Sequence, residues 1–451
     1  MSNKIYIKNA RIVNEGKIFQ GAILIEDEKI SNVFPKDETP ENINPKQTTI
    51  IDAKGKYLLP GIIDTHVHFR DPGLTHKADI FTESKAAIAG GVTSFMDMPN
   101  TIPNVLTQTI LENKFKLAAE KSLANFSFYM GASNNNLQEV LKTNPENVCG
   151  VKVFLGSSTG NMLVDNLEVL NEIFSKSKML IVAHCEDETI IKNNIKIFKE
   201  KFGEDVPIEK HALIHSEEAC FKSSNFIIKI AKKHNSRLHV LHLSTAKETD
   251  LFNNEIQLKD KKITSEVCVH HLWFNEKDYQ KKGVLVKWNP SIKTENDQKA
   301  LFEALMNDKI DIITTDHAPH KIEEKLNTYF KSASGGPFIQ HSLPAMLEFF
   351  HNKKISLEKI AEKMCHNPAV CFNIKNRGFI RKGYYADLTL VDTNSPWEVN
   401  KSNILYKCGW SPLEGQKFNS KITHTFVNGN LVFENGKLNE TVKGKRLLFN
   451  A

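Results

Sequence analysis

The segment PGIIDTHVHFRDPG, Pro60 to Gly73, contains an apolar run that ends in two histidines spaced two residues apart. Alternate residues of a β-strand point to the same face, so His66, His68 and Arg70 are expected to lie together. Two adjacent imidazoles can bind a metal ion, and a neighbouring guanidinium favours an anionic ligand. The segment therefore predicts a strand whose end carries a metal site beside an anion-binding group.

Similar short, β-rich apolar runs recur along the chain and alternate with longer helix-capable segments. Strand–helix alternation predicts a parallel sheet. Eight such units match a closed (β/α)₈ barrel of the TIM type, whose usual size is roughly 250 residues. The eight runs are LPGIIDTHVH, VTSFMDMP, FSFYMGAS, CGVKVFLG, MLIVAHC, RLHVLHLS, KITSEVCVHH and KIDIITTDH.

Both ends of the chain have a different pattern, with short strands and turns. KIYIKNARIV and GAILIEDEKISNVF predict strands near the start, and ADLTLVD predicts one near the end. HTFVNGNLVFENGKL predicts a hairpin with Asn428-Gly429 at its tip. We therefore expect an α/β protein in which residues 56–384 form the barrel. Residues 1–55 and 385–451 are expected to meet as one small β-sandwich.

The bulk properties exclude several classes of protein. The net charge of +6 is spread along the chain without a long basic block, so we expect no nucleic-acid partner. No run approaches the roughly 18 apolar residues of a membrane span, and the start lacks the apolar core of a signal peptide. We expect a cytoplasmic protein without a membrane partner. The seven cysteines form no CxxC pair, which indicates neither a zinc knuckle nor a disulfide framework.

Catalytic groups of such barrels come from the carboxyl ends of the strands. Five of the eight runs carry a potential metal ligand there: His66, His68, Lys152, His184, His242 and Asp316. Lys152 is unusual because it lies inside the apolar VKVFL, where an unpaired ammonium is costly. It either pairs with a carboxylate or, as a neutral amine, reacts with carbon dioxide to form a carbamate that bridges two cations.

Six motifs in a fixed order resemble the amidohydrolase superfamily and, within it, the dihydroorotase family of cyclic amidohydrolases. The resemblance covers essentially the whole chain. The motifs are PGIIDTHVHFRDPG, DMPN (Asp97–Asn100), AHCED (Ala183–Asp187), LHLST (Leu241–Thr245), EVCVHHL (Glu266–Leu272) and TTDHAPH (Thr314–His320).

The resemblance implies two zinc ions held by His66, His68, Lys152, His184, His242 and Asp316. Lys152 would bridge the ions as a carbamate, and Asp316 would also be the catalytic acid/base. Two such ions would generate a shared hydroxide, because metal coordination lowers the pKa of water to about 7. The same resemblance implies that Arg70, Asn100 and His320 hold the substrate's carboxylate, and that Asn289 lies near its pyrimidine ring.

The implied reaction is the reversible cyclisation of N-carbamoyl-L-aspartate to dihydroorotate in pyrimidine biosynthesis, catalysed by a homodimer. Two alternatives stay open: another cyclic amidohydrolase, either allantoinase or dihydropyrimidinase, and a non-catalytic homologue that acts as a scaffold. Arg70 and His320 favour a ring that bears a carboxylate. The complete set of ligands counts against the scaffold.

Some residues depart from the family pattern or are given no site role. Many relatives have NPPLR where this chain has NPSIK, with Ser291 and Lys293. The Gly-rich SASGGPFIQHSLPAML (Ser332–Leu347) resembles the family's substrate-facing loop, and GSSTGNM (Gly156–Met162) is a candidate lid. Packing or support of the ligands is expected for His270 and His271. Structural roles are expected for Asp64, His76, His211, His215, His341 and His366.

Overall fold

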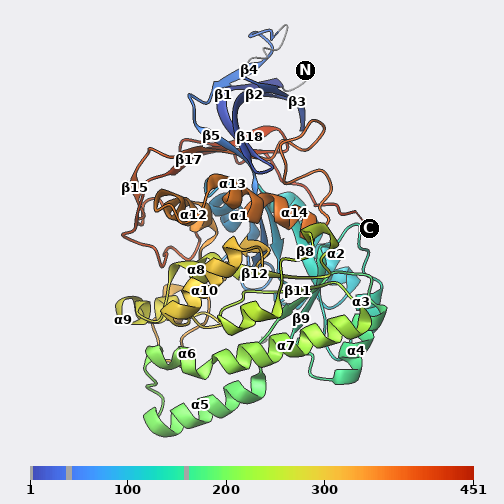
Figure 1. Ribbon diagram of the computed structural model, residues 1–451, viewed down its shortest axis with the longest axis vertical. Helices are drawn as coiled ribbons and strands as arrows, with labels where there is room; N and C mark the ends of the chain where they lie inside the picture. Colours follow the sequence, from blue (N-terminus) through green and yellow to red (C-terminus); the bar gives the residue numbers. More distant parts are fainter. Residues whose placement is uncertain (1–3, 37–42, 157–161, 451) are drawn as a thin grey trace.

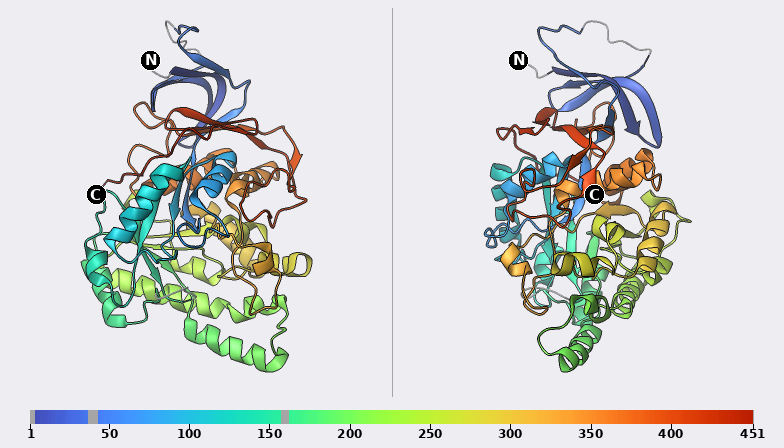
Figure 2. Two further views of the ribbon diagram at one scale, coloured as in Figure 1. Left: turned by 180° about the vertical axis from the view of Figure 1, so that it is seen from behind. Right: turned by 90° about the vertical axis from the view of Figure 1, so that its left-hand side faces the viewer.

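The computed structural model describes residues 4–36, 43–156 and 162–450. An eight-stranded parallel barrel makes up most of it, and a mixed sheet built from both ends of the chain caps one end (Figure 1). Figure 2 shows the blue N-terminal strands and the red C-terminal strands next to each other at that end. The expected fold class is confirmed.

The barrel strands pair in sequence order, and each predicted run contains one of them. Val67 and His317 form a parallel bridge that closes the barrel, with the His68 amide donating to the His317 carbonyl at 2.8 Å. The strands are β6 (Ile62–Val67), β7 (Val92–Asp97), β8 (Asn125–Gly131), β9 (Gly150–Phe154), β10 (Ile181–His184), β11 (Leu238–Val240), β12 (Ile263–Cys268) and β13 (Ile312–Thr314).

Helices between the strands cover the outside of the barrel, as Figure 1 shows for α2, α4 and α7. The longer helices begin at side-chain caps, for example Asp79 before α1 and Ser216 before α7. The helices are α1 (Ile80–Ala89), α2 (Gln108–Lys121), α3 (Leu137–Leu141), α4 (Leu167–Lys176), α5 (Glu188–Phe202), α6 (His211–Ile214), α7 (Glu217–His234), α8 (Val269–Trp273), α9 (Asp278–Lys282), α10 (Glu295–Met306), α11 (Ile322–Lys325), α12 (Ser342–His351), α13 (Leu357–Ala361) and α14 (Asn367–Cys371).

The two chain ends join in one continuous hydrogen-bonded sheet of order β19-β18-β17-β14-β5-β1-β2-β3, with β4 beside β1. The Asn428-Gly429 hairpin is confirmed: both residues have positive φ, 47° and 75°, as a type I′ turn requires. The strands are β1 (Lys4–Asn14), β2 (Lys17–Glu26), β3 (Lys29–Pro35), β4 (Thr49–Asp52), β5 (Tyr57–Pro60), β14 (Leu388–Asp392), β17 (Lys421–Val427), β18 (Asn430–Glu434) and β19 (Lys437–Leu438); β15 (Trp397–Glu398) and β16 (Lys417–Phe418) pair separately.

Strand β5 connects the two sheets. The period-two alternation of a strand sends Leu58 into the apolar core of the outer sheet and Leu59 into the core of the barrel. The run LPGIIDTHVH therefore contains the end of one strand and the start of another, separated by Gly61. A Cβ at Gly61 would lie 2.1 Å from Thr93 Oγ1, so only glycine fits. The division of the chain at residues 55 and 385 stays a prediction.

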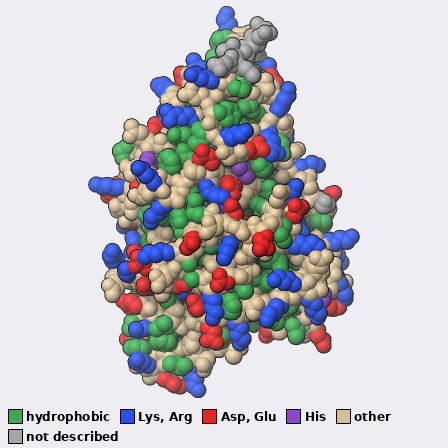
Figure 3. Space-filling model, viewed as in Figure 1, with side chains coloured by type: hydrophobic (Ala, Val, Ile, Leu, Met, Phe, Trp, Pro, Cys, Tyr) green, Lys and Arg blue, Asp and Glu red, His purple; other side chains and the backbone are tan. Residues whose placement is uncertain are grey.

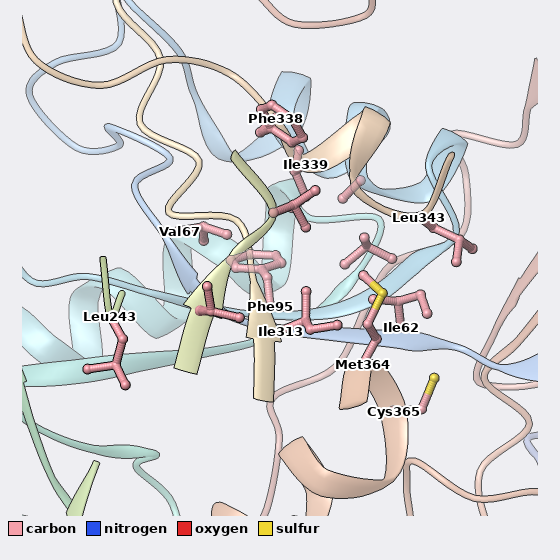
Figure 4. Packing of buried hydrophobic residues seen from close by; sticks show 14 of the residues in the cluster. Ile62, Val67, Phe95, Leu243, Ile313, Phe338, Ile339, Leu343, Met364 and Cys365 are labelled. Atoms are coloured by element: carbon pink, nitrogen blue, oxygen red, sulfur yellow. The ribbon is translucent and has the colours of Figure 1, made fainter. Parts of the chain in front are cut away.

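The barrel core continues beyond the strands (Figure 4). The segment before and within α12 packs against the strands at the point where the barrel closes. The residues in contact there include Ile62, Val67, Phe95, Ile313, Phe338, Ile339, Leu343 and Met364. This packing fixes the position of the chain that leads from β13 to α12, part of which lines the site.

The surface charges, the cysteines and the helices each bear on an expectation drawn from the sequence. Figure 3 shows basic and acidic side chains interspersed over the face in view. All seven cysteines are free thiols, and all but Cys408 are buried. Among the described residues, no helix combines the length and the apolar composition needed to cross a membrane.

Candidate active site

All ten residues predicted for the site line one cavity of about 320 Å³. Its wall also contains Phe154, Trp288, Ala318 and residues 333–335. The predicted residues are His66, His68, Arg70, Asn100, Lys152, His184, His242, Asn289, Asp316 and His320. The structure thus brings together side chains from seven of the eight strand–loop units.

Three of these residues have a backbone conformation that is uncommon for residues other than glycine. Arg70, His242 and Asp316 have φ values of 64°, 36° and 46°. Each follows the end of a barrel strand, where the chain turns sharply to aim the side chain at the cavity. Such strain is typical of functional sites, where the surrounding structure holds it in place.

The first group of donor atoms consists of His66, His68 and Asp316. Asp316 Oδ1 lies 3.2 Å from His66 Nε2 and 3.1 Å from His68 Nε2. Burial raises the pKa of Asp316, but the neighbouring histidines more than offset this, so the carboxylate is ionised. Burial lowers the pKa of His68 to about 4. Two imidazoles and a carboxylate suit a divalent cation such as zinc.

The second group consists of His184 and His242. His184 Nδ1 lies 2.8 Å from His242 Nε2. Burial lowers the pKa of both histidines below the usual value. The rings of His66 and His242 are 5.3 Å apart, so the two groups are adjacent. This spacing suits two neighbouring cations.

Lys152 extends from the middle of β9 and is 1 % exposed. Its Nζ lies 4.4 Å above the Phe154 ring, and no carboxylate among the described residues pairs with it. Burial lowers the pKa of Lys152 to about 7, although Asp316 and Glu266 oppose the shift. A neutral amine is therefore accessible near neutral pH, which is what a reaction with carbon dioxide requires.

Two buried glutamates support the histidines and were missed in the sequence. Glu266 accepts from His66 Nδ1 at 2.6 Å, from His239 Nε2 at 3.1 Å and from the His242 amide at 3.2 Å. Burial would raise its pKa, but His66 and His239 hold it at about 2. The bond to Nδ1 leaves Nε2 of His66 free to bind a metal, a common arrangement of metal-binding histidines.

Glu186 has the same role for the second group. Its two carboxylate oxygens contact His184 Nε2 at 3.1 Å and His215 Nδ1 at 2.7 Å. Both glutamates lie inside quoted motifs, AHCED and EVCVHHL. The spacing of two residues between His184 and Glu186 was the available signal.

The anion-binding group lies beside the first histidines. Arg70 is 8 % exposed and donates from Nε to the Pro319 carbonyl at 3.2 Å. Lys77 Nζ, which has no acceptor site, lies 3.0 Å from His320 Nδ1, so that nitrogen accepts. His320 Nε2 then carries the proton and donates to the Ser334 carbonyl at 3.1 Å. Arg70 Nη2 lies 3.1 Å from the same nitrogen, while Arg70 Nη1 has no hydrogen-bond partner among the described residues.

His320 is neutral in this arrangement. Burial and the Arg70 charge lower its pKa to about 3. It therefore brings no charge to the cavity, and its one N–H group is directed at the Ser334 carbonyl. Asn100, also expected to bind substrate, accepts from His68 Nδ1 at 2.8 Å and so orients a candidate metal ligand as well. Asn289 Oδ1 is buried without a hydrogen-bond partner among the described residues, as a subsite for a ligand N–H requires.

The remaining predicted residues have structural contacts. Asp64 accepts from the His66 and Thr315 amides and ties β6 to the chain after β13. His270 stacks on Trp288 with ring centroids 4.5 Å apart. Lys293 donates to Ser291 Oγ at 2.7 Å, so the two departures from the family pattern contact each other. Most of the candidate lid GSSTGNM lies outside the described residues.

Comparison with known proteins agrees with the geometry. The model of the amidohydrolase family matches residues 57–432. A dihydroorotase of Methanosphaera stadtmanae is 33% identical over 96% of both chains, and one of Pyrococcus furiosus is 32% identical over 97% of this chain and 96% of its own. Among solved structures, the L-hydantoinase (dihydropyrimidinase) of Arthrobacter aurescens superposes with a TM-score of 0.89 at 28% identity, covering 97% of this chain and 98% of its own.

The barrel with its strand-end histidines defines the class of cyclic amide hydrolases. The chain belongs to the amidohydrolase family and, within it, to the dihydroorotases.

Proposed function

We propose that the protein catalyses the reversible cyclisation of N-carbamoyl-L-aspartate to dihydroorotate. One observation supports this most: Arg70 lies in the same cavity as the donor groups, and its Nη1 has no hydrogen-bond partner among the described residues. A planar guanidinium matches a carboxylate, which dihydroorotate carries and dihydrouracil lacks. The identity of about a third with curated dihydroorotases points to the same substrate.

We further propose that the cavity binds two zinc ions. His66, His68 and Asp316 would hold one, His184 and His242 the other, and Lys152 would bridge them as a carbamate. The donor set fits, since it combines imidazoles, a carboxylate and a buried lysine without a carboxylate partner among the described residues. Bound zinc supplies a nucleophile near neutral pH because it lowers the pKa of water.

The chain's own residues handle the proton and the substrate. Ionised Asp316 would accept the proton released from water and give it to the ring nitrogen that leaves. Arg70, Asn100 and neutral His320 would hold the substrate's carboxylate and so fix the ring. Asn289 would accept a hydrogen bond from a ring N–H. In the cyclisation direction, the same groups act in reverse order.

The similarity to the L-hydantoinase supports a second candidate function, the hydrolysis of neutral cyclic amides. The test is a side-by-side assay of dihydroorotate, allantoin and dihydrouracil with purified protein of measured metal content. We expect turnover of dihydroorotate far above the other two. If the protein prefers allantoin or dihydrouracil, the proposal is rejected. If it binds no metal and turns over none of the three substrates, the non-catalytic scaffold is favoured. The expected homodimer stays a prediction that light scattering can check.

A further inference from the structure

One wall of the cavity is formed by Ala333, Ser334 and Gly335, which follow α11 in the chain. Gly335 has a φ of 119°, and a Cβ there would lie 2.7 Å from the Ala318 carbonyl oxygen. The Gly335 amide donates to the Lys287 carbonyl at 2.9 Å. The backbone thus packs directly on the chain that follows β13.

Two buried lysines hold this wall. Lys325 is fully buried, and its Nζ lies 2.8 Å from the Ala333 carbonyl, 2.8 Å from the Gly335 carbonyl and 3.1 Å from the Lys287 carbonyl. Lys287, 6 % exposed, donates to the Tyr329 and Ser332 carbonyls at 2.6 Å and 2.7 Å. An ammonium has three donors and no acceptor, so Lys325 uses two of its donors on this wall and the third on the Lys287 carbonyl.

These two lysines differ from Lys114 and Lys363, which are also buried. Lys114 pairs with Asp97 at 2.6 Å, and Lys363 pairs with Asp308 at 2.7 Å. Within the described ranges, Lys287 and Lys325 pair with no carboxylate; their ammonium groups contact backbone carbonyls. Burial lowers the pKa of both, to about 8 for Lys287. The carbonyls oppose this shift, because three acceptors around Lys325 need three donors and a neutral amine has two.

A buried ammonium without a counter-charge is costly, and an apolar side chain of similar volume would serve stability as well. Hydrogen bonds from a charged donor are strong and directional, so they fix the positions of the carbonyls. The wall also contacts His320, a proposed substrate-binding residue, because the Ser334 carbonyl accepts from His320 Nε2 at 3.1 Å.

We propose that Lys287 and Lys325 are positioning residues, which clamp residues 332–335 so that the wall and His320 keep their places against the bound ring. The proposal rests on the proposed function, since it assigns the cavity to a cyclic amide. The clamp itself is a property of the free protein. It acts on substrate affinity and needs no contact between either lysine and the substrate.

The test compares Lys325→Met and Lys287→Met with Lys363→Met, a matched control that removes a buried lysine which contacts Asp308 and the Ile310 carbonyl, away from the cavity. The full-length, zinc-loaded proteins are examined by amide hydrogen exchange of residues 329–336, by melting temperature and by kcat and KM for dihydroorotate. Because charge-assisted bonds are lost, we expect roughly 10- to 100-fold lower kcat/KM, mainly through KM, in both clamp variants.

Exchange in 329–336 should also become faster by about tenfold or more in the clamp variants, with unchanged metal content. Lys363→Met should melt earlier yet keep wild-type exchange in 329–336 and wild-type KM. The clamp is refuted if its variants lose only stability, as the control does. If Lys325→Met does not fold, the results for Lys287→Met decide whether the clamp exists. If wild-type protein fails to turn over dihydroorotate, the proposed function fails, while the exchange result still decides the clamp.

Discussion

Replacing Arg70 by methionine removes the only guanidinium that lines the described cavity and keeps most of the side chain's volume. Arg70 is 8 % exposed, so a carboxylate bound to it would be largely removed from water. Loss of one partner of such a buried charge pair costs about 2–5 kcal/mol. At about 1.4 kcal/mol per factor of ten, kcat/KM for dihydroorotate should fall between about 30-fold and about 4,000-fold.

The assay measures kcat/KM for dihydroorotate and for its neutral carboxamide, with metal content determined on the same samples. The carboxamide should lose much less than dihydroorotate, because it presents no charge to Arg70. Metal content should not change, since a guanidinium has no lone pair to bind a cation. Arg237→Met is a matched control at the other end of the barrel, where Arg237 donates to the Cys371 carbonyl. Equal losses on both substrates would mean that Arg70 supports the site and does not select the carboxylate.

Three further predictions concern the donor groups and pH. Lys152→Ala should lose metal and activity together, and added propionate should restore part of both; an active, metal-loaded variant would contradict the bridge. Glu266→Gln should weaken metal affinity by roughly 10- to 100-fold, because His66 loses the partner that orients it; unchanged affinity in a chelator titration would remove Glu266 from this role. His320, with a pKa of about 3, is neutral throughout pH 6–8. The KM for dihydroorotate should therefore stay level over that range, whereas a cationic His320 would make KM rise as the pH increases.

The barrel and the candidate metal ligands could be predicted because both depend on local patterns, whereas Asn100, Asn289 and His320 were implied by the family resemblance. An apolar run with a histidine at its end identifies a barrel strand, and the parallel arrangement brings all such strand ends to the same end of the barrel. Leu59 shows the limit of this reasoning. Its run continues through Gly61 into β6, and only the three-dimensional packing shows that Leu59 belongs to a strand of the other sheet.

The supporting residues were not predictable in the same way. Glu266 faces the barrel interior by alternation, but its partner His66 is 200 residues away in the chain, and no local pattern indicates the pairing. Lys325 stands in the polar KIEEKLN and resembles a surface lysine in sequence. Lys287 stands in the apolar VLVKW, but no local pattern indicates which carbonyls it contacts. The charge state of His320 could not be read from the sequence either, because its lowered pKa depends on burial and on Arg70 and Lys77, which come from a different part of the chain.

The central claim is that the cavity holds two metal ions bridged by a modified lysine. Anomalous diffraction at the zinc edge, from crystals of zinc-replete protein, tests it most directly. Two peaks are predicted, one between His66, His68 and Asp316 and one beside His184 and His242, with extra density on Lys152 Nζ that joins them. Absence of anomalous density between these side chains, or an unmodified Lys152 in the fully loaded enzyme, would contradict the account.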